Sequence, residues 1–264
     1  MKDILLAMAH YGSTNRNYFL SCLREYNSFK KYVLDVHLYL TEELDVSEFS
    51  NLKITQHIFD PSIGHYLTHE HKQLFAENLD LYNYFIYSED DMLITESHMD
   101  AYVGVQLMLS TPFVCGFMRY ELRKDSDYKF LIDNHPIHSC HRGGNRVVKD
   151  NYMIFSEPYF EVYNFHQAFY ILPNSLMRFV LNSGRYMEND YHYAGILEGA
   201  ASNIFFKCGL IKIIPRNRVS EFIVHHLSDR YANRADLAHI YTTEQTPDDE
   251  KMKIMQLDLP PIYV

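Results

Sequence analysis

Short apolar runs and amphipathic stretches alternate along the first third of the chain. Four segments have the length and apolar content of strands: 4–9, 32–40, 52–59 and 84–87. Two further segments, 15–26 and 67–79, carry apolar residues at the spacing of one helix face. The order strand–helix–strand–strand–helix–strand predicts an α/β fold, a Rossmann-like domain whose mostly parallel central sheet is flanked by helices.

The pattern continues less regularly through the rest of the chain. We expect a helix over 96–109 and a strand over 113–119, followed by loops and short strands between 122 and 158. Periodicity returns in four segments: 168–172, 174–181, 191–206 and 211–214. An apolar segment at 222–227 contains two histidines, and the charged, Pro-containing stretch 236–264 is predicted to be an extended C-terminal tail. The pattern therefore favours one domain over 1–235.

Composition indicates a folded protein and argues against one class of partner. Of the 264 residues, 47% are hydrophobic and 15% aromatic, which is enough apolar surface for a large core. The formal net charge is -10 at pH 7, and no block of Lys and Arg stands out, so no nucleic-acid partner is expected. A small anionic ligand is still compatible with this charge if a metal ion supplies positive charge locally.

The cysteines and the first apolar run bear on the compartment. The four cysteines are widely scattered: Cys22, Cys115, Cys140 and Cys208. They form no C-x-x-C pair and are sparser than a secreted disulfide framework, which predicts reduced thiols and a cytoplasmic protein. The run 4–9 is too short for a signal peptide or a membrane span, so no transmembrane segment is expected.

Three consecutive acids follow the fourth predicted strand and carry the strongest chemical signal. Segment 84–87 is apolar or aromatic, and Glu89, Asp90 and Asp91 come directly after Ser88. Ligands of open α/β sheets collect at the carboxyl ends of strands, where three partly buried acids would repel one another. A divalent cation resolves this conflict, and Mg²⁺ or Mn²⁺ favours a few carboxylates together with ligand phosphates. A solvated turn after the strand is the alternative.

The passage from Tyr82 to Asp91 resembles the short acidic motif of GT-A-type, metal-dependent glycosyltransferases. It is most similar to the Glu-Asp-Asp variant of N-acetylglucosaminyltransferase-like enzymes, and the similarity in layout covers about residues 1–230. The resemblance implies a GT-A-like domain with a donor-nucleotide half over about 1–120 and an acceptor half over about 121–235. It also implies that Asp91 binds Mn²⁺ or Mg²⁺ and that Glu89 and Asp90 contact the nucleotide-sugar donor.

The turn after the first strand is the second candidate for donor binding. His10, Tyr11 and Gly12 precede the first predicted helix, and Arg16 lies near its start. Such a turn offers free backbone N–H groups and glycine flexibility to a nucleotide. In the resembled family the matching loop holds the base and ribose. An ordinary strand-to-helix turn is the alternative, and the absence of G-x-G-x-x-G leaves a dinucleotide site unsupported.

Candidates late in the chain complete the predicted site. By the resemblance, a C-terminal histidine closes the metal site. Since adjacent strand residues point in opposite directions, only one of His225 and His226 should face it, and we favour His226. An inverting transferase also needs a base for the acceptor hydroxyl. Glu198, a lone acid in an apolar helical run, is the first candidate, and Asp190 is the second.

These residues predict a glycosyltransferase that moves a hexosyl or pentosyl group from a nucleotide-diphosphate sugar to a glycan or other hydroxyl acceptor, by an inverting route. One alternative is a nucleotidyltransferase acting on sugar phosphates, although the turn after the first strand is poor in the Lys, Arg and Gly of its usual phosphate loop. The other is a non-catalytic carbohydrate-binding protein in which the many tyrosines stack on sugars and the acids form a surface turn.

Overall fold

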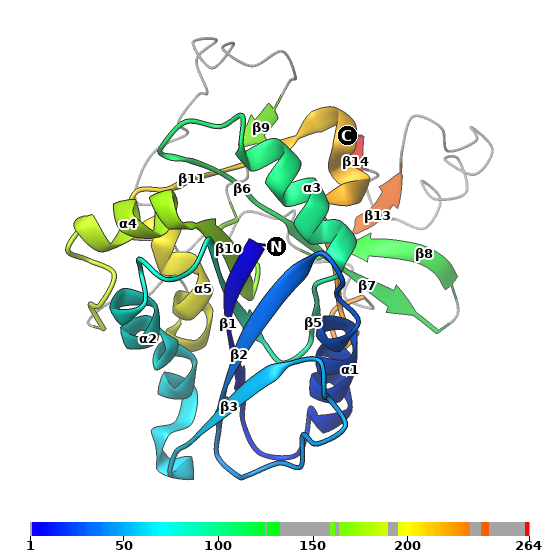
Figure 1. The fold of residues 1–264 in the computed structure, drawn as a ribbon. Coiled ribbons are helices and arrows are strands. Elements are labelled where there is room, and N and C mark those ends of the chain that lie inside the picture. Colours follow the sequence, from blue (N-terminus) through cyan, green and yellow to red (C-terminus); the bar gives the residue numbers. More distant parts are fainter. Residues whose placement is uncertain are drawn as a thin grey trace.

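A five-stranded sheet forms the centre of the computed structural model, which describes residues 2–124, 126–132, 159–161, 164–189, 195–232, 239–242 and 262–263 (Figure 1). Its strand order is β10-β4-β1-β2-β3. The strands are β1 (Lys2–His10), β2 (Tyr32–Leu40), β3 (Lys53–Ile58), β4 (Tyr84–Glu89) and β10 (Phe169–Pro173). β1 to β4 run parallel, and β10 is antiparallel to β4. The prediction of an α/β fold with a mostly parallel sheet flanked by helices is confirmed.

The two central strands are apolar because both faces of the sheet are covered. Residues 4–9 of β1 are at most 7% exposed, and residues 84–87 of β4 are equally shielded. β1 and β4 pair in a register that sets Ala9 opposite Glu89. Their carboxyl ends therefore coincide, and His10 comes to lie beside the acids that follow β4.

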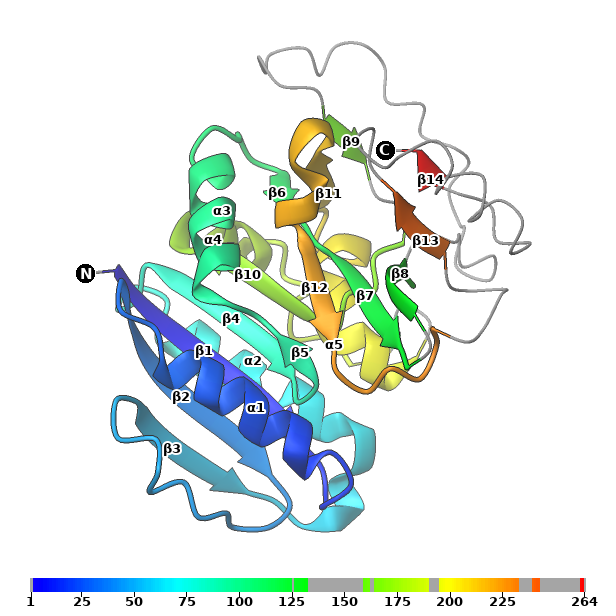
Figure 2. The same ribbon diagram turned by 90° about the vertical axis from the view of Figure 1, so that its right-hand side faces the viewer.

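Helices cover the two faces of this sheet. α1 (Arg16–Asn27) and α2 (His71–Glu77) lie on opposite faces (Figures 1 and 2), and α1 buries Phe19, Leu23 and Tyr26. The single helix expected over 67–79 is wrong in detail. The chain forms the 3-10 segment η1 (Pro61–His69), whose N-cap Asp60 accepts a hydrogen bond from the Ser62 amide, and only then α2. Gly64, at φ 54°, interrupts the helical backbone within η1.

Two further sheets are built from strands that follow β4 in the chain. The six-stranded sheet has the order β14-β13-β8-β7-β12-β5, and the three-stranded sheet has the order β6-β11-β9. The first contains β5 (Met92–Leu93), β7 (Met118–Arg123), β8 (Ser126–Leu131), β12 (Ile223–His226), β13 (His239–Thr242) and β14 (Ile262–Tyr263). The second contains β6 (Phe113–Cys115), β9 (Tyr159–Glu161) and β11 (Ile211–Pro215). Part of the predicted C-terminal tail therefore joins a sheet, since β13 pairs with β8.

The strand expected over 113–119 is divided between these two sheets. It breaks at Gly116 and Phe117, between β6 and β7. A side chain at Gly116 has no room, because a Cβ there would lie 2.4 Å from Cγ of the buried Lys212. Phe117 packs against the rings of Phe169 and Phe222. Tertiary packing around this dipeptide therefore decides where the chain changes sheets.

The remaining helices are α3 (Glu96–Gln106), α4 (Asn174–Asn182), α5 (Ile196–Phe206) and the 3-10 segment η4 (Arg216–Glu221). α3 starts with a capping box, in which the Thr95 hydroxyl accepts from the His98 amide and the His98 ring accepts from the Thr95 amide. α5 packs against η1. Within the described ranges, no helix combines the length and apolar character of a membrane span.

Candidate functional site

The turn Asp90-Asp91 carries the chain from the central sheet into the six-stranded sheet. β4 ends at Glu89 and β5 begins at Met92, and β5 pairs with β12 so that His226 lies opposite Met92. Figure 2 shows β12 running beside β5 at the end of β4. The acids thus lie at the junction of the two sheets, at the carboxyl end of a buried parallel strand, as ligand sites of α/β proteins do.

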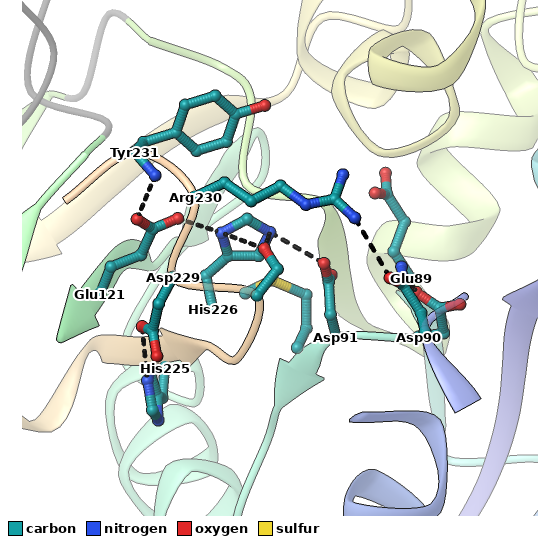
Figure 3. Close-up of polar contacts among 12 residues, drawn as sticks. Glu89, Asp90, Asp91, Glu121, His225, His226, Asp229, Arg230 and Tyr231 are labelled. Atoms are coloured by element: carbon teal, nitrogen blue, oxygen red, sulfur yellow. Dashed lines mark hydrogen bonds and ion pairs between the residues drawn. The ribbon is translucent and has the colours of Figure 1, made fainter. Parts of the chain in front are cut away.

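The imidazole of His226 bridges two carboxylates. Its Nε2 lies 3.0 Å from Oδ2 of Asp91, and its Nδ1 lies 2.5 Å from Oε1 of Glu121 (Figure 3). All three residues are buried, and Glu121 is 0% exposed. Neighbouring His225 turns away, stacks on Tyr120 and contacts Asp229 at 3.1 Å. Of the two histidines, it is therefore His226 that faces the acidic turn.

This bridge fixes the charges at neutral pH. Burial alone would lower the pKa of His226, but the hydrogen bonds to Asp91 and Glu121 outweigh it and raise the pKa to about 9. Burial would raise the pKa of Asp91, but the hydrogen bond with His226 outweighs it, so the pKa is lowered. In the ligand-free protein, a protonated His226 therefore neutralises an ionised Asp91.

Asp90 is held from the other side of the turn by residues of β1 and α1. Its Oδ2 lies 2.6 Å from Nδ1 of His10, and its Oδ1 accepts a hydrogen bond of 3.0 Å from the amide of Asn15. Burial nevertheless raises the pKa of Asp90, since these contacts offset only part of the desolvation. Both oxygens of this carboxylate are occupied, so Asp90 is positioned by the protein itself.

Several polar atoms at this turn are buried without a hydrogen-bond partner among the described residues. They are Oε1 of Glu89, Oδ1 of Asp91 and Nε2 of His10. Burial, followed by the charge of Asp91, raises the pKa of Glu89 well above its usual range. Buried polar atoms normally find partners, so unsatisfied ones that line a cavity are the atoms on which a ligand would act.

A cavity of about 390 Å³ opens onto this turn. Sequence-predicted residues form part of its wall: His10, Tyr11, Glu89, Asp90, Asp91, Glu198 and His226. The other wall residues come from β1, η1, β7, α5, the N-cap of α1 and the segments before β10 and after β12: Ala9, Asn15, Gly64, His65, Leu67, Thr68, Arg119, His166, Leu197, Arg230 and Tyr231. Residues from both predicted halves of the domain therefore line one cavity.

Three predicted residues are not placed in this wall. Gly12 takes a positive φ of 63° and donates its amide to the Thr41 hydroxyl, so it shapes the turn without lining the cavity. Arg16 is exposed on α1 and also lies outside the lining. The expectation that Arg16 helps to bind the donor stays a prediction. Asp190 lies outside the described residues.

Glu198 lies in the first turn of α5, as a partly buried member of the cavity wall. Its carboxylate folds back over the N-cap residue Gly195. The approach is so close that a Cβ at Gly195 would lie 2.6 Å from Oε2 of Glu198. The absence of a side chain at Gly195 therefore leaves room for this carboxylate. An acid at a helix N-terminus is also favoured by the helix dipole.

The sequence interpretation missed four residues of the site: Asn15, Arg119, Glu121 and Arg230. Glu121 accepts hydrogen bonds from the backbone amides of Tyr231 and Ala232, at 2.5 and 2.6 Å, besides contacting His226. Arg119 is 7% exposed and its charge lowers the pKa of Asp91, after the effects of burial and His226. Arg119 and Glu121 alternate along β7, and that alternation was the available signal for one shared face.

No protein-family model matches the chain, and no curated protein matches it. Among the described residues, no three His, Cys, Asp or Glu side chains are preassembled as a metal-binding group.

Proposed function

We propose that the cavity binds a nucleotide-diphosphate sugar with a divalent cation and transfers the sugar to a hydroxyl acceptor. The observation that carries this proposal is the acidic turn at the carboxyl end of β4, faced by His226 and containing buried oxygen atoms without partners. Its resemblance to the Glu-Asp-Asp motif of GT-A-type glycosyltransferases supports the same reading. The route is inverting, with Mn²⁺ or Mg²⁺ as the cation.

The residues around Asp91 fit a divalent cation. Oδ1 of Asp91 has no hydrogen-bond partner in the described part of the chain, and Oδ2 lies 3.0 Å from Nε2 of His226. His226 could hold an ion only after its Nε2 gives up the proton that it shares with Oδ2 of Asp91, so cation binding would release a proton. Glu121 behind His226 matches the carboxylates that orient metal-binding histidines. Asp91 and His226 would hold the ion, and diphosphate and water would complete its shell.

When bound, such a cation would stabilise negative charge on the diphosphate leaving group. The chain itself supplies the remaining tasks. His10 and Asn15 fix Asp90 so that its backbone and carboxylate form a rigid rim for the ribose or sugar of the donor. Tyr11, about half exposed on the opposite rim, offers a ring on which the base can stack.

Glu198 is the proposed general base. During transfer, the bond from the anomeric carbon to the diphosphate oxygen breaks, and the nucleoside diphosphate leaves with the electron pair. A new bond forms between that carbon and the acceptor oxygen, whose proton passes to the Glu198 carboxylate. The place of Glu198 in the wall that contains the acidic turn supports this role. Asp190 is the second candidate.

A thermal-shift screen of nucleotide sugars, with and without Mn²⁺, tests the proposal. A ligand that binds the native state raises the unfolding temperature by mass action. We expect at least one nucleotide sugar to raise it only when Mn²⁺ is present. If no nucleotide sugar shifts the transition under either condition, the proposed function is wrong.

Product analysis then separates the enzymatic alternatives. A glycosyltransferase releases a nucleoside diphosphate from the active donor, whereas a nucleotidyltransferase exchanges pyrophosphate with it. A carbohydrate-binding protein does neither and is stabilised by free glycans without metal. Chromatography of the nucleotide products distinguishes these three results, after parallel incubations with Mn²⁺ and either a panel of sugar acceptors or pyrophosphate.

A further inference from the structure

Arg230 extends across the cavity from the acceptor side to the donor side. It lies four residues after the end of β12, and its guanidinium donates a hydrogen bond of 3.2 Å to Oδ1 of Asn15, the N-cap residue of α1. The side chain is exposed and forms part of the cavity wall. Asn15 in turn donates to Asp90, so Arg230 ends within one residue of the acidic turn.

The backbone around Arg230 is held without the help of its guanidinium. The Leu227 amide donates to the carbonyl of Asp91 at 2.8 Å. The amides of Tyr231 and Ala232 donate to the buried carboxylate of Glu121. Hydrogen bonds of backbone amides therefore hold the loop on both sides of Arg230. The guanidinium can change partners while the loop stays in place, and its removal should leave the loop folded.

The cations of the cavity differ in what surrounds them. His226 lies between the carboxylates of Asp91 and Glu121, which neutralise it. Arg119 is buried, and its charge acts on Glu89 and Asp91. Arg230 instead contacts the amide oxygen of Asn15, which is neutral. A guanidinium has several N–H donors in a planar fork that suits phosphate oxygens, so this contact leaves donors for an anion.

We propose that Arg230 binds the diphosphate of the donor nucleotide by exchanging the Asn15 amide oxygen for phosphate oxygens. A charge-assisted, two-point contact is stronger than its present neutral hydrogen bond, so the exchange is favourable when a phosphate enters the cavity. This inference rests on the proposed function, because it assigns a residue to the donor of the same site. It makes Arg230 a determinant of selectivity for diphosphates over monophosphates.

Calorimetric titration of nucleoside diphosphates and the matching monophosphates, in the presence of Mn²⁺, tests the assignment. We expect Arg230→Ala to weaken diphosphate binding by about 10- to 100-fold, the loss of a charged hydrogen bond. Monophosphate binding should change less, so the preference for diphosphate should shrink. Arg230→Lys should fall between wild type and Arg230→Ala, because it keeps the charge and loses the fork.

Arg24→Ala is the matched control. Arg24 lies on the exposed side of α1 and pairs with Glu48 at 3.3 Å, so its removal changes the net charge equally but leaves the cavity intact. Its diphosphate affinity should stay within about two-fold of wild type. If Arg24→Ala loses as much diphosphate affinity as Arg230→Ala, the loss is an effect of net charge, and the assignment is wrong.

The failures of the two proposals look different. If wild type binds no nucleoside diphosphate, the proposed function itself is wrong. If wild type binds diphosphates and Arg230→Ala binds them equally well, only the role of Arg230 is wrong. A lower unfolding temperature of Arg230→Ala with an unchanged preference for diphosphate over monophosphate would show that Arg230 merely ties the loop to Asn15.

Discussion

The carboxylate of Glu121 holds the imidazole of His226 at 2.5 Å, although 105 positions separate the two residues in the chain. Since the same carboxylate also accepts from two backbone amides after β12, it fixes both the ring and the loop that carries Arg230. The ring nitrogen that remains faces Asp91. Glu121 therefore positions both His226 and the loop after β12 beside the acidic turn.

Glu121→Gln should weaken metal-dependent nucleotide binding by about 10- to 100-fold, the usual effect of removing a partner behind a metal-binding histidine. The amide keeps the shape but lacks the charge that holds His226. Titration with Mn²⁺ and a nucleoside diphosphate measures the change. Glu221→Gln, at an exposed carboxylate paired with Arg218, is the control and should bind as wild type does. If wild type, Glu121→Gln and Glu221→Gln bind the nucleotide with equal affinity, Glu121 has no role in metal-dependent binding.

Asp91→Asn should abolish the part of nucleotide binding that depends on Mn²⁺ and leave the fold intact. The substitution removes one charge with almost no change of shape, and His226 keeps Glu121 as a partner. Calorimetry with a nucleoside diphosphate, with Mn²⁺ or with a chelator, provides the measurement. Asp80→Asn, at an exposed acid paired with Arg178, controls for the loss of charge. Unchanged Mn²⁺-dependent affinity of Asp91→Asn would contradict the metal assignment.

Glu198→Gln should lower turnover by about 10²- to 10⁴-fold and leave donor binding nearly unchanged, because the amide cannot accept the proton of the acceptor. Gly195→Ala offers an independent check at the same carboxylate. Its methyl group would displace Oε2 of Glu198, while the extended backbone at φ -162° tolerates any residue. Both variants should therefore lose turnover with little loss of stability. Turnover within a few-fold of wild type in Glu198→Gln would reject the base role and move it to Asp190.

Gly116→Ala should destabilise the protein by about 1–3 kcal/mol, because the added methyl group overlaps the buried side chain of Lys212. Gly104→Ala is the matched comparison. It lies exposed in the interior of α3, and an added Cβ meets no atom within 4 Å. The same substitution there should stabilise by about 0.5–1 kcal/mol. Urea denaturation of the two variants should give shifts of opposite sign, and shifts of the same sign would contradict the packing described at Gly116.

His98 should make the protein sensitive to mild acid. Burial lowers its pKa to about 4, against about 6.5 in the unfolded chain. The unfolded state then binds more protons between these values, so the stability is complete above pH 6.5 and is lost as the pH falls toward 4. The loss has an upper bound of about 3 kcal/mol. His98→Gln keeps a side chain that suits the capping box but cannot titrate. The free energy of unfolding should change less with pH in this variant than in wild type. Equal pH dependence in the two proteins would show that His98 does not cause the acid sensitivity.

The central sheet and the acidic turn could be predicted because local sequence patterns indicate both. Uninterrupted apolar runs mark strands buried on two faces, and residues 84–87 lead directly into the acids. The alternation of strand side chains predicted that only one of His225 and His226 faces the site, and His226 was the one favoured. Glu198 was found because a lone acid in an apolar helix is unusual. Each of these signals lies within a few residues of the feature that it indicates.

The rest depended on contacts between distant segments. Glu121 follows the alternation of an ordinary half-exposed strand, and its carboxylate is contacted by His226 of β12 and by the backbone amides of Tyr231 and Ala232, more than 100 positions away in the chain. Arg230 reaches Asn15 across the junction of the two sheets, which no local pattern contains. Likewise, 113–119 was predicted as one strand, and its division at Gly116 goes with the close approach of Lys212, which lies far away in the sequence.

The meeting of the acidic turn with β12 has a consequence for biosynthesis. A ribosome completes the turn long before it reaches His226 and Arg230, the cations that lie against it. Until His226 emerges, closing the sheet junction would bury Asp91 without its ion-pair partner, which is costly. The nascent N-terminal half should therefore hold this junction open and hydrated. A truncated product that ends before β12 would lack His226 and Arg230 as well as a strand. Cellular proteases should therefore degrade it faster than a product that lacks the strand pairing of β12 but keeps both cations.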